Sequence, residues 1–225
     1  LLRGKGKTAS DPAAAGSREP SLTLVIDAGH GGEDGGAVSP RGLRESAVNL
    51  DVARRLDYLA AFFGVKTVMT RESEEILYSD AAVTTRARKA EDQNSRLAMI
   101  RSTPNAVLIS VHQNNYTDSA PFGAQAFYAP TEGSRELAEL LQESLIASLD
   151  TTNRRAAEKI QDTILLMNSV DCPAVLVECA FLSNPREEEL LHTDGYRLKL
   201  AAVIAAGVLR GRGELGAIYG LEAAL

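Results

Sequence analysis

Short apolar runs recur along the chain, and each is bounded by turn-forming residues. Six of them are predicted to be β-strands because they are brief, rich in β-branched side chains and interrupted by Gly, Pro, Asn or Asp. Their ranges are 22–27 (LTLVID), 65–70 (VKTVMT), 106–112 (AVLISVH), 123–129 (GAQAFYA), 163–167 (TILLM) and 174–178 (AVLVE). The first run is apolar almost throughout, which is typical of a strand buried inside a sheet.

Helical spacing separates these strands. From Glu45 onward, apolar residues recur every three or four positions up to Phe63, and Gly64 then ends the predicted helix. Asn184, Pro185 and Glu187 mark another helix start, as N-cap, first helical residue and capping-box acid. Three longer helices are predicted at about 85–101, 134–149 and 194–210.

The alternation of strands and long helices predicts the α/β class. We expect a single domain with a six-stranded, mostly parallel sheet flanked by helices on both faces. A length of 225 residues is compatible with one hydrophobic core. Residues 1–20 mix Gly, Ala, Ser, Pro and charge without periodicity and are interpreted as a flexible linker or remnant. The folded domain is expected over 21–212, followed by a tail at 213–225.

Composition narrows the classes of partner. The formal net charge is −6, so no general electrostatic attraction to nucleic acid is expected. Trp is absent and aromatics make up 5% of the residues, which argues against a surface of stacking platforms. Cys172 and Cys179 are separated by an apolar run that would hold their sulfurs apart if extended, so we expect two buried thiols and no mutual disulfide.

Four side chains with metal or acid–base chemistry fall at one topological position. His30 follows the first predicted strand, and Glu45 opens the helix after the same loop. His112 ends the third strand, and Glu178 ends the sixth. Because ligand sites in open α/β sheets form at the carboxyl ends of strands, these four side chains are expected to converge.

The residue types suit a catalytic zinc ion with a bound water. Two imidazoles and one carboxylate, here His30, Glu45 and His112, make a common zinc shell that leaves the fourth position to water. The ion lowers the pKa of that water and polarises a carbonyl. A carboxylate outside the shell can carry the proton from water to a leaving amine, and Glu178 is the candidate.

Each residue also has a simpler interpretation. His30 could cap local backbone groups, Glu45 could face the helix dipole, and His112 could be a core histidine. Glu178 is hardest to explain otherwise, since an unpaired buried carboxylate is costly. The glycines at 29, 31, 32, 35 and 36 could suggest a phosphate loop, but no complete phosphate-binding motif is present. His192 is interpreted as a solvated residue at a helix end.

The blocks around these residues resemble a known family. DAGHGGEDGGAVSPRGLRES, TVMTR, ISVHQNN and PAVLVECAFLSNPREEELL occur in this order over roughly 22–206. They resemble the zinc-dependent N-acetylmuramoyl-L-alanine amidases of the Amidase_3 type. The stretches GAVSPRGL and GAQAFY are most similar to the sporulation and germination-specific members, which act on spore cortex.

The resemblance implies a six-stranded α/β fold with one zinc ion held by His30, Glu45 and His112, and Glu178 as the catalytic glutamate. The implied reaction is hydrolysis of the amide between N-acetylmuramic acid and L-Ala of a peptidoglycan stem peptide. In the cortex branch this reaction is the first step toward muramic-δ-lactam. The implied setting is extracytoplasmic, with an export or anchor segment outside this sequence. Sporulation members can depend on an accessory protein. The sequence does not decide whether the protein is a monomer or a homodimer.

Some features leave alternatives. Gln113 and Asn115 depart from the family's usual residues after the second histidine, and we interpret them as altered substrate contacts. Some members insert an inhibitory helix near the site, and the segment 72–84 is too short for such a helix to be predicted from the sequence. A zinc peptidase or deacetylase with another substrate would share the metal chemistry. A non-catalytic wall-binding domain would have no chemical reason to keep all four residues.

Overall fold

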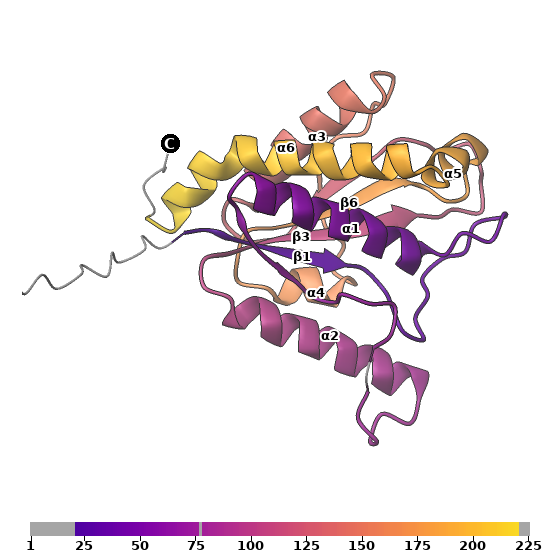
Figure 1. Cartoon of the computed structure of the whole chain (residues 1–225), viewed down its shortest axis with the longest axis horizontal. Helices are drawn as coiled ribbons and strands as arrows, with labels where there is room; N and C mark the ends of the chain where they lie inside the picture. The colour runs from indigo at the N-terminus through magenta and orange to yellow at the C-terminus, as the bar shows by residue number, and fades with distance from the viewer. Residues whose placement is uncertain (1–20, 77, 221–225) are drawn as a thin grey trace, which may run out of the picture.

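The computed structural model of the chain describes residues 21–76 and 78–220, which form an α/β domain (Figure 1). Its sheet has six strands in the order β2-β1-β3-β6-β4-β5. The strands are β1 (Thr23–Ala28), β2 (Lys66–Met69), β3 (Ala106–Asn114), β4 (Gln125–Tyr128), β5 (Glu158–Lys159) and β6 (Ala174–Phe181). The helices are α1 (Glu45–Phe62), α2 (Thr85–Ser102), α3 (Ser134–Ser148), α4 (Leu165–Ser169), α5 (Pro185–Leu191) and α6 (Asp194–Ile218). The predicted linker at 1–20 lies outside the described residues.

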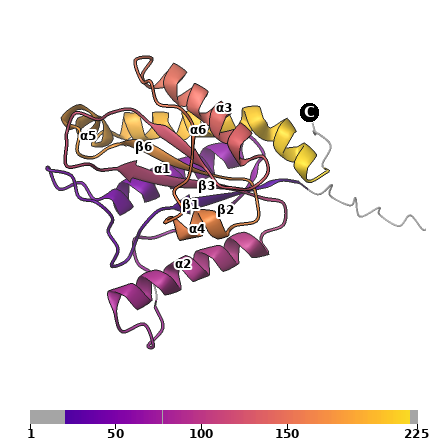
Figure 2. The same cartoon turned by 180° about the vertical axis from the view of Figure 1, so that it is seen from behind.

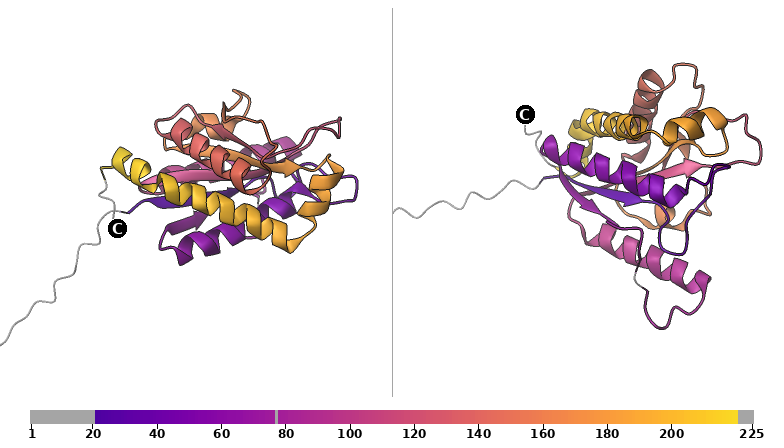
Figure 3. Two further views of the ribbon diagram at one scale, coloured as in Figure 1. Left: turned by 90° about the horizontal axis from the view of Figure 1, so that it is seen from above. Right: turned by 45° about the vertical axis from the view of Figure 1, so that its right-hand side comes forward.

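The sheet is mostly parallel, as predicted. Strands β2, β1, β3 and β6 run in one direction, and β4 pairs with β6 in the opposite direction. Helices α1, α3 and α6 cover one face, while α2 and α4 cover the other (Figures 1 and 2). Seen from above, α6 and α1 lie side by side across the sheet (Figure 3). The expected architecture of helices on both faces is confirmed.

Two buried clusters explain why the strands are apolar on both sides. Leu24 and Ile26 of β1 belong to the larger cluster, between the sheet and α1, α3 and α6. Val25, between them in sequence, belongs to the smaller cluster under α2 and α4. All three are fully buried. Successive side chains of a strand point to opposite faces, so a central strand covered on both faces must be apolar throughout.

The prediction of a strand at 163–167 is wrong. Residues 165–169 form the short helix α4, in which Met167 is buried in the smaller cluster while Leu165 is exposed. A short apolar run has too little periodicity to separate a strand from a helix. The fifth strand lies earlier, at Glu158–Lys159, where it pairs with β4 through two exposed polar residues. Such an edge pairing leaves no apolar pattern in the sequence.

Helix α6 continues to Ile218, beyond its predicted end near Arg210 and into the range assigned to the tail. Gly207 and Gly211 of this helix pack against α3. A Cβ at Gly207 would lie 2.6 Å from the Leu141 side chain, so the small residue allows the two helices to approach closely. At the end of α1, Phe63 lies just outside the helix and is exposed, not on the buried face.

Smaller predictions have mixed outcomes. Asn184 caps α5 as expected, accepting hydrogen bonds from the backbone N–H groups of Arg186 and Glu187. The Glu187 carboxylate does not close a capping box, because it accepts from Phe181 N at 2.7 Å and Gly123 N at 2.9 Å.

Both cysteines, Cys172 and Cys179, are buried free thiols. Across 21–76 and 78–220, none of the helices combines the length and apolarity that crossing a membrane requires.

Candidate metal centre

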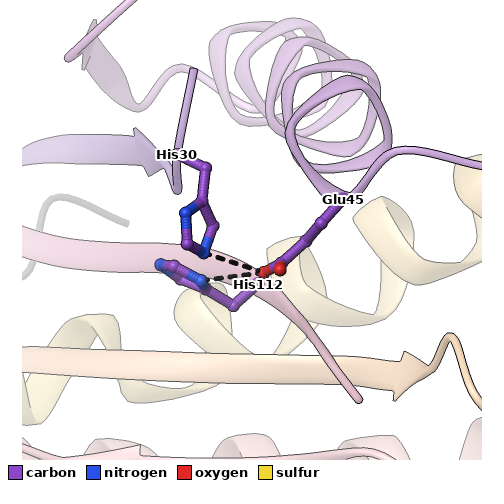
Figure 4. Close-up of side chains that lie close together, drawn as sticks. All are labelled: His30, Glu45 and His112. Carbon is purple, nitrogen blue, oxygen red and sulfur yellow. Dashed lines mark hydrogen bonds and ion pairs between the residues drawn. The ribbon is translucent and has the colours of Figure 1, made fainter. Parts of the chain in front are cut away.

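His30, Glu45 and His112 converge at the carboxyl edge of the sheet (Figure 4). His30 lies in the loop after β1, Glu45 is the first residue of α1, and His112 lies near the end of β3. Glu45 Oε1 is 3.3 Å from His30 Nε2 and 3.1 Å from His112 Nδ1. One ligand atom from each residue lies within 4.8 Å of the others. Two nitrogens and one carboxylate oxygen at this spacing could hold a metal ion.

Asp34 contacts the ring nitrogen of His30 that does not face Glu45: Asp34 Oδ1 lies 3.1 Å from His30 Nδ1. This contact leaves Nε2 to face Glu45, and a carboxylate on the second nitrogen is a common partner of a metal-ligating histidine. Burial tends to lower the pKa of His30, but Glu45 and Asp34 together raise it. The backbone of His30 has a φ of 60°, which is rare for a residue other than glycine and is typical of functional loops.

Two buried arginines hold this loop in place. Arg96 of α2 donates to the carbonyl oxygens of Ala28 and His30, both at 2.7 Å, and pairs with Asp27 at 2.8 Å. Arg71, which follows β2, donates a hydrogen bond of 2.8 Å to the carbonyl oxygen of Ala28. Burial opposes ionisation of Asp27, yet Arg96 and two hydroxyl donors lower its pKa to about 2. The carboxylate therefore remains charged and keeps Arg96 against the loop.

Sequence reasoning did not single out these supporting residues. Asp27 and Arg71 lie within the blocks that carry the family resemblance, so their position could have suggested a role. Arg96 lies in a polar helix with many charged residues and carries no distinguishing local signal.

Glycine is required where the loop packs on the ligands. A Cβ at Gly29 would overlap the imidazole ring of His112. At Gly36, which has a φ of 65°, a Cβ would lie 2.6 Å from Glu45 Oε2. The backbone of the loop therefore packs directly against the side chains of His112 and Glu45, which only glycine allows. This packing explains the glycine-rich composition that also resembles a phosphate-binding loop.

Backbone and amide donors fix the Glu45 carboxylate. Oε1 accepts from Gln113 N at 3.2 Å, and Oε2 accepts from Ala37 N at 2.9 Å. Burial raises the pKa of Glu45, but the neighbouring histidines, His112 first, lower it well below the usual range. The Gln113 side chain is buried and donates to Asn49 of α1 at 3.2 Å. Our interpretation of Gln113 as a substrate contact is therefore wrong, because its side chain points toward α1.

Glu178 lies beside this centre on β6, in register with His112 of β3. The strand continues past it to Phe181, so Glu178 does not end the strand as predicted. Its Oε2 atom is buried and has no hydrogen-bond partner among the described residues. Burial raises the pKa of Glu178 to about 7, although His112 lowers it. A carboxyl group with a pKa near neutrality can both accept and donate a proton at physiological pH. His192, by contrast, is exposed at the end of α5, as expected.

Comparison with known families and proteins gives the arrangement a context. Residues 24–210 match the Amidase_3 family, described as N-acetylmuramoyl-L-alanine amidase. A germination-specific N-acetylmuramoyl-L-alanine amidase of Bacillus subtilis is 39% identical over 189 residues, which cover 83% of this chain and 78% of that protein. The amidase LytC of Bacillus subtilis is 32% identical, with 83% of this chain and 35% of LytC covered.

Solved structures agree with these matches. The CwlD amidase of Clostridioides difficile, determined in complex with the GerS lipoprotein, superposes with a TM-score of 0.80 and is 35% identical. That match covers 84% of this chain and 98% of CwlD. The amidase AmiC2 of Nostoc punctiforme superposes with a TM-score of 0.70 at 26% identity, over 84% of this chain and 96% of AmiC2. The resemblance predicted from the sequence blocks is confirmed.

Proposed function

Because the chain belongs to the N-acetylmuramoyl-L-alanine amidase family and is an enzyme of peptidoglycan hydrolysis, we propose that it is a zinc-dependent amidase of the spore cortex. It cleaves the amide between the lactyl group of N-acetylmuramic acid and L-Ala of the stem peptide. The convergence of His30, Glu45 and His112 beside Glu178 carries this proposal. The match to a germination-specific amidase supports the cortex as the setting.

In this proposal, His30, His112 and the Glu45 carboxylate would hold the zinc ion. The donor set fits, since two imidazole nitrogens and one carboxylate oxygen are preferred by catalytic zinc, and Asp34 on the second nitrogen of His30 supports that role. When bound, zinc polarises the scissile carbonyl and makes water easier to deprotonate. Glu45 is held as a carboxylate by its neighbours, which suits a ligand and not a proton carrier.

Glu178 acts as the general base and acid. Its carboxylate accepts a proton from the attacking water, whose oxygen forms the new bond to the lactyl carbonyl carbon. As the carbon–nitrogen bond breaks, Glu178 returns the proton to the nitrogen of L-Ala. Water is consumed, and the products are a muramoyl carboxylic acid and a peptide with a free amino terminus. Removal of the stem in this way would precede the later formation of muramic-δ-lactam.

The comparisons also suggest where and with what the enzyme works. Several relatives are amidases described as cell-wall or germination-specific, so an extracytoplasmic location is proposed for this chain. The CwlD structure contains a lipoprotein, which supports an accessory protein as a partner here. The region 21–220, which includes the whole of α6, is proposed to be sufficient for catalysis.

Digestion of purified peptidoglycan tests the function. Zinc-loaded protein, with and without an accessory lipoprotein, is incubated with cortex and with vegetative sacculi, and the products are identified by mass spectrometry. We expect free stem peptides that begin with L-Ala, and muramic acid that has lost its peptide, with cortex as the better substrate. A peptidase would cut within the stem, and a deacetylase would remove acetate. Either of those products, or no release under any condition, would contradict the proposal.

A further inference from the structure

A cavity of about 700 Å³ is lined by residues that are close in sequence to two of the metal ligands. We call it the loop pocket; Gly32 and Tyr78 line it together with the charged residues Glu33, Arg44, Glu74, Glu75, Asp80 and Arg88. Gly32 follows His30 by two residues, and Arg44 directly precedes Glu45. A smaller cavity of about 150 Å³ lies against His30 and His112 on the side of α2 and α4. The smaller cavity reaches two of the metal ligands, and the larger loop pocket reaches the sequence neighbours of His30 and Glu45.

The charged groups of the two cavities also differ. In the smaller cavity, Asp34 pairs with Lys89 at 2.8 Å, and Arg96 pairs with Asp27 and Asp92. In the loop pocket, Arg88 pairs with Glu33 and Glu74 with Arg71, while Glu75 and Asp80 also line the pocket and make no ion pair with any described residue. Arg44 is exposed, and its guanidinium makes no ion pair or hydrogen bond with any residue that the structure describes. It is thus a cation free to receive an anionic group of a ligand.

The Arg44 guanidinium is packed close to the metal ligands. A Cβ at Gly35 would lie 2.6 Å from Arg44 Nη2, and a Cβ at the next residue, Gly36, would lie 2.6 Å from Glu45 Oε2. The guanidinium and the ligating carboxylate therefore lie against the same two-glycine segment. The N–H groups of Glu45 and Ser46 are already bonded to the carbonyls of Ala37 and Gly35. The side chain of Arg44, and not the helix N-terminus, is left to face a ligand.

We propose that Arg44 is a specificity-determining residue that binds the α-carboxylate of the second stem-peptide residue, with the loop pocket taking the peptide half of the substrate. This inference rests on the proposed amidase function. A γ-linked D-glutamate follows L-Ala in the stem, and its linkage leaves the α-carboxylate free. The carboxylate lies about two residues from the scissile amide, or roughly 7 Å along the chain. The planar guanidinium fork of arginine matches a carboxylate in two parallel hydrogen bonds.

The charged groups of the two cavities favour binding of the peptide half in the loop pocket and of the sugar half in the smaller cavity. The stem peptide carries several charged groups, while the sugars next to the scissile bond are largely neutral. The larger cavity, which offers the Arg44 guanidinium together with the carboxylates of Glu75 and Asp80, suits a peptide that carries charged groups. The smaller cavity, whose charges are already paired, suits a neutral group.

Two muropeptides that differ at one group test the assignment. Zinc-loaded wild type, Arg44→Gln and Arg44→Lys are assayed on disaccharide peptides carrying D-isoglutamate or its amide, D-isoglutamine, at position two. We expect Arg44→Gln to raise KM for the carboxylate substrate about tenfold or more with little change in kcat, and to leave the amide substrate nearly unchanged. Arg44→Lys should recover part of the loss, since it keeps the charge without the fork. Arg41→Gln, an exposed arginine three residues earlier, is the matched control.

Binding of the free tetrapeptide to the metal-free protein gives a second readout, by calorimetry. Loss of affinity in Arg44→Gln, with retention in Arg41→Gln, supports the assignment even if no substrate is cleaved. Equal KM changes on both substrates, or unchanged affinity for the peptide, would overturn it. Failure of wild type to cleave either muropeptide would contradict the amidase function itself, so the two ideas fail separately.

Discussion

His112 on β3 and Glu178 on β6 are register partners in the parallel pairing of these strands. Paired residues of adjacent strands present their side chains on the same face of the sheet. His112 Nδ1 lies 3.1 Å from Glu45 Oε1, while Glu178 Oε2 is buried and has no hydrogen-bond partner within 21–76 and 78–220. One pairing in the sheet therefore places the proposed proton carrier beside a proposed metal ligand.

Replacing Glu178 separates metal binding from catalysis. Glu178→Gln should keep zinc at the wild-type ratio and lower kcat by a factor on the order of 10² to 10⁴, since it removes the proton carrier but not a ligand. Elemental analysis and release of stem peptide measure the two properties. Glu189→Gln, on an exposed glutamate of α5, is the control. Wild-type turnover in Glu178→Gln would remove this residue from the mechanism.

The raised pKa of Glu178 predicts a pH-dependent stability for the metal-free protein. The folded-state pKa is about 7, against an ordinary value of 4.5, so this group destabilises the fold progressively as pH rises from below 4.5 through 7. The loss should reach at most about 3 kcal/mol at pH 8. Urea unfolding in chelator should show Glu178→Gln more stable than wild type at pH 8, with the difference shrinking toward pH 4.5. A difference independent of pH would contradict the raised pKa.

The buried pair of Asp27 and Arg96 should support both the fold and the metal site. Arg96→Met leaves the Asp27 carboxylate buried without its partner and frees the His30 loop, so unfolding free energy should fall by about 3–5 kcal/mol. Zinc occupancy should fall with it. Chemical denaturation and elemental analysis measure these effects. Arg86→Met, on an exposed arginine of the same helix, should change neither.

Close packing at Gly29 predicts sensitivity to a single methyl group. Gly29→Ala should displace the His112 ring and lower zinc affinity at least tenfold, at a cost of about 1–3 kcal/mol in stability. Gly195→Ala meets open space in α6 and should leave affinity unchanged. Competition with a chromogenic chelator measures zinc affinity. Equal affinity in the two variants would show that the loop can move away from His112.

Asp34 should act as a positioning residue for His30. Asp34→Ala removes the contact with His30 Nδ1 and should weaken zinc binding by about 10- to 100-fold. Lys89→Met keeps Asp34 but removes its outer partner, so a smaller loss is expected. Competition with the same chromogenic chelator ranks the variants by their zinc affinity. Zinc affinity that is unaffected by Asp34→Ala would mean that packing alone orients the ring.

Local patterns in the sequence determined much of the fold. Five of the six predicted strands, the long helices and the start of α1 at Glu45 follow from apolar periodicity and end signals. The same patterns placed His30, Glu45 and His112 after strands or at a helix start, from which their convergence was predicted. Periodicity reports which face of an element is buried, and this information lies within a few residues of each position.

Only the tertiary structure decided what surrounds those residues. Arg96 pairs with Asp27 across 69 positions of sequence, and the Gln113 side chain points toward α1. The Arg44 guanidinium has no ion-pair partner in the part of the chain that the structure describes. The five-residue helix α4 and the two-residue strand β5 are likewise set by neighbours. The physical reason is that side-chain direction and long-range pairing depend on how elements pack, and packing brings together residues whose separation in the chain carries no local signal.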